Sequence, residues 1–196
     1  GIEDIGIVTG YKRELLTNRS LAEFHNPRWA ETNMVSSLAC AGAWLENGPC
    51  IVSYSDIFYE ATAVSTLVES QADLALTYDP NWRSKWAVRF GDPLVDAETF
   101  QIDSTGSMTE IGNMPTIVDE IQGQYMGLLR FTPDGWAEVK RIWTGLPATE
   151  ADRVHMTGML QRVIVAGRVP VKGFAYGGVW GEVDSESDLD AAEKSI

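Results

Sequence analysis

The chain contains little cysteine, few basic side chains and no long apolar segment. Its two cysteines, Cys40 and Cys50, form no CxxC pair, so the sequence predicts two free thiols in a reducing cytoplasm and no disulfide framework. No apolar run reaches the ~18 residues that a transmembrane helix needs. No basic segment followed by an apolar one opens the chain, so a signal peptide is not expected. We therefore expect a cytoplasmic protein without a membrane partner.

Positive charge is also scarce. The 15 lysines and arginines are outnumbered by 28 aspartates and glutamates, which gives a formal net charge of −13 at pH 7. Such a charge repels a phosphate-rich polymer, so we do not expect a nucleic-acid partner. A small anionic ligand stays compatible with it if a cation or backbone N–H groups offset the nearby carboxylates. The GxSxG, HExxH, Walker and GxGxxG motifs are absent as well.

What the sequence does contain is enough apolar material for a substantial core. The 196 residues are 44% hydrophobic and show no repeat, low-complexity segment or linker, so we predict one domain over residues 1–196. The large aromatic side chains suit core packing in most cases, although some could line a ligand pocket. The rings considered are Trp82, Trp86, Tyr125, Trp136, Trp143, Tyr176 and Trp180.

Strands and helices alternate along the first 80 residues. Apolar spacing predicts strands over residues 5–8, 49–54 and 72–78, with helices over residues 32–45 and 61–70 between them. This alternation is typical of an α/β domain with a mainly parallel sheet.

The second half of the chain departs from this alternation. It contains a predicted hairpin over residues 100–111, followed by strands over 124–131 and 169–174 and by helices over 133–143, 156–166 and 188–194. We therefore predict a Rossmann-like, mainly parallel sheet flanked by helices, with a small antiparallel insertion near the active site.

Two acidic positions are candidates for a metal site. Asp56 follows the predicted strand 49–54, and open α/β sheets bind ligands at the carboxyl ends of their strands. Glu182 and Asp184 are two residues apart, so in a strand they face the same side. Mg²⁺ prefers such carboxylate oxygens together with phosphate oxygens. A structural interpretation stays open for each: Asp56 could cap the next turn, and the pair could belong to a solvated acidic loop.

Polar groups at two predicted helix starts are weaker candidates. Asn33, Ser36 and Ser37 could bind a ribose, base or phosphate, although helix capping explains Asn33 nearly as well. His155 precedes the helix over residues 156–166 and could reach a ligand. Neither His155 nor His25 has the spacing of a metal-ligand pair.

Three segments carry a resemblance to a known family. The sequences TNMVSSL at 32–38, YSDI at 54–57 and WGEVD at 180–184 resemble the nucleotidyltransferase superfamily. The most similar branch is the cytidylyltransferases of the choline-phosphate and 2-aminoethylphosphonate type, and the similarity extends over essentially the whole chain. Thr-Asn-Met followed by Ser-Leu is fairly specific to this branch, whereas a lone aspartate after a strand is not.

The resemblance implies a reaction and its participants. CTP and a small phosphorylated or phosphonate substrate, such as phosphocholine or 2-aminoethylphosphonate, would bind side by side over the sheet, and pyrophosphate would leave. Mg²⁺ is the implied cofactor, with Asp56, Glu182 and Asp184 as its ligands and with Asp56 and Asp184 as the catalytic pair. By family position the nucleotide would be bound by Asn33, Ser36 and Ser55. The acceptor would be bound by Trp86, Arg89, Glu120, Gln124, Tyr125 and His155.

Two departures from the family pattern affect these expectations. A strand, a glycine-rich Leu-Ala-Ala-Gly-x-Gly loop and a Lys-Pro segment should precede Gly1, and the sequence contains none of them. The resemblance therefore implies that the chain begins late or is a fragment, and a true fragment should not catalyse. A basic residue is also more usual where Asn113 stands, which affects how the anionic group of the acceptor would be bound.

Other functions stay open on sequence grounds. A sugar-1-phosphate nucleotidyltransferase would use a related sheet, whereas a glycosyltransferase would usually show Asp-x-Asp where Tyr54-Ser55-Asp56 stands. A nucleotide-binding remnant without activity is the third alternative. The sequence leaves open whether the protein forms a homodimer.

Overall fold

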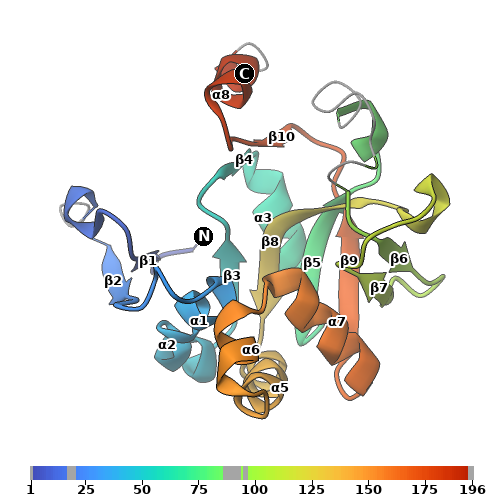
Figure 1. Ribbon diagram of the computed structural model, residues 1–196. Coiled ribbons are helices and arrows are strands. Elements are labelled where there is room, and N and C mark those ends of the chain that lie inside the picture. The colour runs from blue at the N-terminus through green and yellow to red at the C-terminus, as the bar shows by residue number, and fades with distance from the viewer. Residues whose placement is uncertain (1, 17–20, 86–93, 95–96, 194–196) are drawn as a thin grey trace.

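A four-stranded sheet runs through the centre of the molecule. The computed structural model describes residues 2–16, 21–85, 94 and 97–193. The strand order is β3, β8, β5, β9 (Figure 1). These strands are β3 (Cys50–Ser53), β8 (Gln124–Phe131), β5 (Leu74–Asp79) and β9 (Val171–Ala175). β3, β5 and β9 share one direction, and β8 runs against both of its neighbours. The predicted α/β fold is confirmed, with an antiparallel strand inside its sheet.

Helices cover both faces of this sheet. Figure 1 shows α7 (Met156–Ala166) in front of the sheet and α3 (Ala61–Glu69) behind it. Helix α5 (Pro133–Thr144) packs against β8 and α7. Local sequence signals explain where these helices begin and end. The Thr132 hydroxyl accepts the N–H of Gly135 at the start of α5, and α7 ends at Gly167, which has a φ of 65°.

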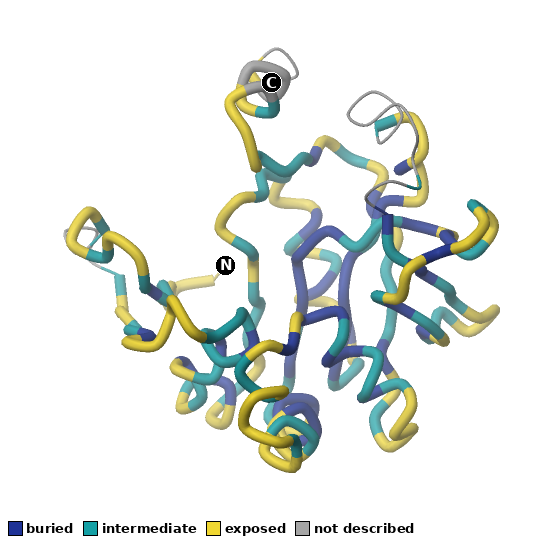
Figure 2. Tube along the Cα trace, in the orientation of Figure 1, coloured by how far each residue is buried: buried dark blue, intermediate teal, exposed yellow. Residues whose placement is uncertain are grey.

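The core lies between the sheet and these helices. Figure 2 shows buried residues concentrated in the central strands and on the inner sides of the helices. Most of β5 is buried on both faces, which is why it reads as a continuous apolar run. Core packing of the aromatic residues is confirmed for Trp82, Trp136, Tyr176 and Trp180. Trp86 lies outside the described residues.

The helix predicted over residues 32–45 is two helices. α1 (Met34–Ala39) ends at Cys40, and α2 (Gly42–Asn47) starts after Ala41, whose ψ of 13° is no longer helical. The break lets the two halves pack in different places, because α1 contacts α6 and α7 while α2 contacts α5. Gly42, a poor helix former, lies at the break.

The remaining elements are short. A hairpin of β6 (Phe100–Ile102) and β7 (Met108–Ile111) confirms the predicted antiparallel insertion. β1 (Gly6–Thr9) pairs in parallel with the unpredicted β2 (Ala22–His25) in a separate sheet. Further short helices are η1 (Arg13–Leu15), η2 (Val118–Glu120), α6 (Ala148–Arg153) and α8 (Glu186–Glu193). None of the helices within the described ranges is long and apolar enough to cross a membrane. Cys40 and Cys50 are both free thiols.

Candidate active site

Three carboxylates meet at the carboxyl edge of the central sheet. Ligand oxygens of Asp56, Glu182 and Asp184 all lie within 4.8 Å of one another. Asp56 and Asp184 are exposed and Glu182 is half-buried. We call these residues the acidic triad. Negative groups so close together repel unless a cation lies between them. The donors are all hard oxygens, without a nitrogen or sulfur ligand, and this set suits Mg²⁺ better than Zn²⁺.

A two-stranded ribbon brings the triad together. β4 (Ile57–Tyr59) pairs antiparallel with β10 (Trp180–Glu182), and Ile57 faces Glu182 in the register. The N–H of Val183 donates to the carbonyl oxygen of Asp56 at 2.8 Å, which extends the pairing by one step. Asp56 is thereby placed beside the end of β10, where Glu182 and Asp184 lie. Three-residue strands leave too short a pattern for sequence analysis to detect.

Buried polar contacts fix β10 to the central sheet. The Trp180 indole N–H donates to Asp79 Oδ2 at 2.8 Å, and Lys85 Nζ lies 2.8 Å from the same oxygen. Asp79 ends β5 and is only 1% exposed. Lys85 Nζ is also 4.9 Å from the Trp180 ring centroid, a cation–π contact. The position of β10 therefore depends on this Asp79–Lys85–Trp180 cluster.

A second contact holds the loop between β9 and β10. The Tyr176 hydroxyl donates to Glu60 Oε2 at 3.1 Å, and the N–H of Val179 donates to the same oxygen at 3.4 Å. Glu60 directly precedes α3. The loop that leads into the triad is thus attached to the helix behind the sheet.

Two half-buried tyrosines lie beside the triad. The rings of Tyr54 and Tyr125 contact each other edge to face, with centroids 5.8 Å apart. Burial raises the pKa of the Tyr54 hydroxyl, and the charges of Glu98, Asp56 and Glu182 raise it further. Burial likewise raises the pKa of Tyr125. Both phenols therefore stay neutral at ordinary pH, and the Tyr54 hydroxyl donates to Met34 Sδ at 2.6 Å.

Gly127 allows this tyrosine pair to form. It has a φ of 78°, a left-handed conformation that glycine adopts without strain. A Cβ atom at this position would lie 2.8 Å from Cγ of Tyr54. The register between β5 and β8 shifts beside Gly127. A bulge in β8 thus makes room for the Tyr54 ring.

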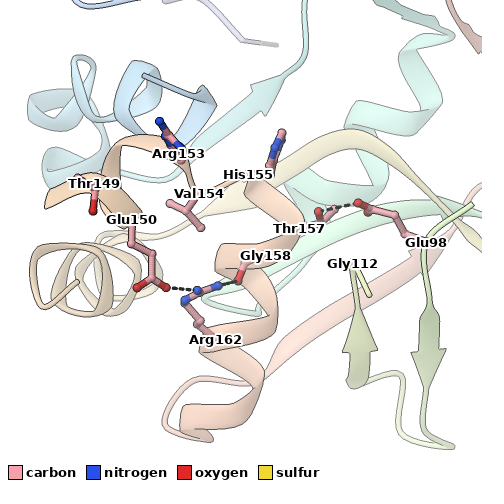
Figure 3. Close-up of a pocket in the computed structure, with 10 residues that line it drawn as sticks. All are labelled: Glu98, Gly112, Thr149, Glu150, Arg153, Val154, His155, Thr157, Gly158 and Arg162. Atoms are coloured by element: carbon pink, nitrogen blue, oxygen red, sulfur yellow. Dashed lines mark hydrogen bonds and ion pairs between the residues drawn. The ribbon is translucent and has the colours of Figure 1, made fainter. Parts of the chain in front are cut away.

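A cavity of about 490 Å³ opens beside the start of α7. Its lining side chains come from α6, from the start of α7 and from the segments before β6 and after β7 (Figure 3). His155 is the one predicted site residue among them. Thr157 Oγ1 donates to Glu98 Oε1 at 3.2 Å on one side of the cavity, and Arg162 pairs with Glu150 on the other.

Comparison with known proteins identifies the family. No family model matches the sequence. The chain is, however, 32% identical over an alignment of 206 residues to CTP:phosphoglutamine cytidylyltransferase of Campylobacter jejuni subsp. jejuni serotype O:2. The alignment covers 97% of this chain and 81% of that relative. The chain is a cytidylyltransferase of the nucleotidyltransferase superfamily. The family resemblance found in the sequence is confirmed.

Solved structures support the same fold. The inositol-1-phosphate CTP transferase from T. maritima superposes with a TM-score of 0.73 at 17% identity, over 98% of this cytidylyltransferase and 76% of that chain. A Bacillus anthracis protein assigned as a glucose-1-phosphate thymidylyltransferase superposes with a TM-score of 0.74 at 12% identity, over 98% and 75% of the two chains. At these identities the likeness concerns the fold alone.

The residues predicted to bind the nucleotide fall in two places. Ser55 is exposed next to Asp56 of the triad. Asn33 instead caps α1, because its Oδ1 accepts the N–H of Met34 at 2.7 Å. Its amide nitrogen lies 3.3 Å from both ring nitrogens of His155. The Ser36 hydroxyl lies 3.5 Å from the carbonyl oxygen of Ala151. Asn33 and Ser36 therefore face α6 and α7, beside the cavity.

The residues predicted to bind the acceptor are also dispersed. Glu120 Oε2 accepts the N–H groups of Thr116 and Ile117, at 2.6 and 3.3 Å, and these bonds lower its pKa. Its carboxylate is thus occupied by its own loop. Gln124 pairs with Asp79 in the sheet, and the next residue is Tyr125 of the tyrosine pair. Trp86 and Arg89 lie outside the described residues.

Several residues of the site carried no signal in the sequence. Asp79, Lys85 and Glu98 belong to no motif, and the importance of each comes from distant partners. Arg153 and Thr157 flank His155, which the sequence did indicate, but their place in a cavity depends on the segments after β7 and before β6. A search for polar residues near predicted helix starts would have found them only together with many others.

Proposed function

We propose that this cytidylyltransferase transfers CMP from CTP to a small phosphorylated or phosphonate acceptor and releases pyrophosphate, with Mg²⁺ bound by the acidic triad. The observation that supports the metal site is the convergence of Asp56, Glu182 and Asp184, whose oxygens lie within 4.8 Å of one another. They come from two segments more than 120 residues apart, and a ribbon pairing holds them together.

In this proposal the metal ion and the residues of the chain have different roles in the reaction. When bound, Mg²⁺ would neutralise charge on the triphosphate. The triad would hold it at the sheet edge, with the neutral phenols of Tyr54 and Tyr125 beside it. A phosphoryl or phosphonyl oxygen of the acceptor attacks the α-phosphorus of CTP, and the bond to the pyrophosphate oxygen breaks. Catalysis would be positioning and charge stabilisation.

The direct test is pyrophosphate release by the full-length protein. Each nucleoside triphosphate is supplied with phosphoglutamine, phosphocholine, 2-aminoethylphosphonate and sugar 1-phosphates. We expect release with CTP and a small acceptor, loss of release with EDTA, and recovery with excess Mg²⁺. Release only with UTP or dTTP and a sugar phosphate would instead support a sugar-1-phosphate nucleotidyltransferase.

Asp56→Asn tests the metal ligand. The amide keeps the shape of the side chain but lacks the charge that a hard cation needs. We expect a loss in kcat/KM greater than the ~10–100-fold that outer-shell residues of metal sites cost. The control is Asp134→Asn, which removes an exposed carboxylate in the first turn of α5, at the opposite end of the sheet (Figure 1). Near-normal activity of Asp56→Asn, with its fold intact by circular dichroism, would show that the assignment is wrong.

A further inference from the structure

The cavity beside α7 is adjacent to the triad. Contacts connect the two regions. The Tyr54 hydroxyl, two residues before Asp56, donates to Met34 Sδ at 2.6 Å, and the neighbouring Asn33 lies 3.3 Å from His155 in the cavity wall. A molecule in the cavity would therefore be connected to the triad through α1 and Tyr54. The cavity is therefore suitably located for the part of the acceptor that does not react.

The size of the cavity fits a small molecule. Its volume of about 490 Å³ lies within the roughly 300–1,000 Å³ that is typical of small-molecule sites. His155 also links it to α1, where the Asn33 amide lies 3.3 Å from the imidazole. The cavity thus borders the predicted nucleotide-binding helix.

The walls of the cavity carry charges of both signs. Arg153 is exposed and has no ion-pair partner within the described ranges. Glu98 and the hydroxyl of Thr157 lie across from it, and Arg162 and Glu150 form an ion pair at the edge (Figure 3). Among the described lining residues none is a phenylalanine, tyrosine or tryptophan. A quaternary ammonium is normally bound by such rings, so the described lining, with charges of both signs, suits a ligand with charged groups better than phosphocholine.

A zwitterion matches it better. We propose that the cavity binds the amino-acid end of a phosphorylated amino acid, with Arg153 binding the α-carboxylate and Glu98 the α-ammonium. This inference rests on the proposed function, because it names the class of acceptor for that reaction. A guanidinium pairs with a carboxylate through two parallel hydrogen bonds, which gives orientation as well as affinity. The curated relative, by its name, acts on phosphoglutamine, a compound of this class.

A matched set of acceptors tests the assignment. O-Phosphoserine and phosphoglutamine carry both charged groups. Phosphoethanolamine is O-phosphoserine without the carboxylate, and 3-phosphoglycerate is O-phosphoserine with a hydroxyl in place of the ammonium. We expect at least one of the two phosphorylated amino acids to have a higher kcat/KM with CTP than phosphoethanolamine, 3-phosphoglycerate or phosphocholine.

Arg153→Met is the decisive variant. It should lower the preference for O-phosphoserine over phosphoethanolamine by about 10- to 100-fold, the range expected for a charge-assisted hydrogen bond. Arg153→Lys should restore part of it. Glu98→Gln should lower the preference for O-phosphoserine over 3-phosphoglycerate instead. The control, Arg168→Met, removes an exposed arginine near Glu138 at the other end of α7 and should change neither preference.

Binding by calorimetry separates this inference from the proposed function. O-Phosphoserine or phosphoglutamine should bind the unmodified protein and bind Arg153→Met more weakly, whether or not pyrophosphate is released. Absence of turnover with every acceptor would count against the proposed function alone. Turnover that favours phosphocholine, or an unchanged preference in Arg153→Met, would overturn the assignment of the cavity while leaving CTP-dependent transfer standing.

Discussion

Trp180→Phe would test whether the triad depends on the buried cluster beneath it. The substitution removes the indole N–H that donates to Asp79 Oδ2 at 2.8 Å, where Trp180 is 6% exposed and Asp79 is 1% exposed. Lys85 would still contact that oxygen, and the N–H of Asn81 would still donate to Oδ1 at 2.7 Å. The carboxylate would therefore lose one donor without becoming isolated.

The expected loss of stability follows from these contacts. A hydrogen bond to a charged group contributes about 1.5–3 kcal/mol, and the smaller ring leaves a void that adds to this. For a domain of this size, about 1 kcal/mol lowers the Tm by roughly 2–4 °C. A total of roughly 2–4 kcal/mol corresponds to a fall of roughly 4–16 °C. Because β10 also carries Glu182, the Mg²⁺ concentration for half-maximal activity should rise.

Trp136→Phe is the matched control. Trp136 is 1% exposed and packs edge to face on Phe131, but its indole N–H has no hydrogen-bond partner in the described part of the chain. This variant loses the same ring atoms without weakening a charged hydrogen bond. Differential scanning calorimetry and Mg²⁺ titrations of pyrophosphate release would compare the two. An equal or smaller fall in Tm for Trp180→Phe, with unchanged Mg²⁺ dependence, would refute the reasoning.

Two further substitutions probe the cavity and the acid stability. Gly112→Ala should raise the acceptor KM and lower the Tm more than Gly106→Ala does. Both glycines have a positive φ, but only a Cβ atom at position 112 would lie 2.8 Å from Thr157 Cβ. Equal effects of the two substitutions would argue against close packing in the cavity wall at Gly112. Glu138→Gln should flatten the acid limb of the stability curve, because Arg141 lowers the pKa of Glu138 in the folded protein. The ion pair of Glu138 with Arg141 stabilises the folded protein above the unfolded pKa of about 4.3. This stabilisation is lost as the pH falls through the lowered pKa of the folded state. Urea unfolding between pH 7 and pH 3 would measure the loss.

Local sequence signals located the long elements closely. Residues 124–131 and 156–166 form β8 and α7 at the predicted limits, since their apolar periodicity is strong and Gly167 ends the helix. The direction of β8 could not be predicted in this way. Both faces of an inner strand are buried whether its neighbours run parallel or antiparallel, so the residue pattern does not distinguish the two.

The prediction of one continuous helix over residues 32–45 was wrong for a related reason. Its apolar spacing continues across the break at Ala41, but α1 and α2 pack on different partners. Packing outweighs intrinsic helix propensity, which is worth less than about 1 kcal/mol per residue. The sequence pattern records which residues are apolar and not which surface covers them.

The residue types of the site could be read from the amino-acid sequence alone. They are an aspartate after a strand and a pair of carboxylates two residues apart, in a chain whose family resemblance the curated relative confirms. That Asp56 lies beside Glu182 and Asp184 is visible only in the folded chain, because the pairing of β4 with β10 joins segments that are distant along the sequence. The same holds for the contact of Asn33 with His155 and for the cavity that Arg153 and Glu98 line. Contacts of this kind depend on how buried strands and helices pack, and a local pattern does not encode them.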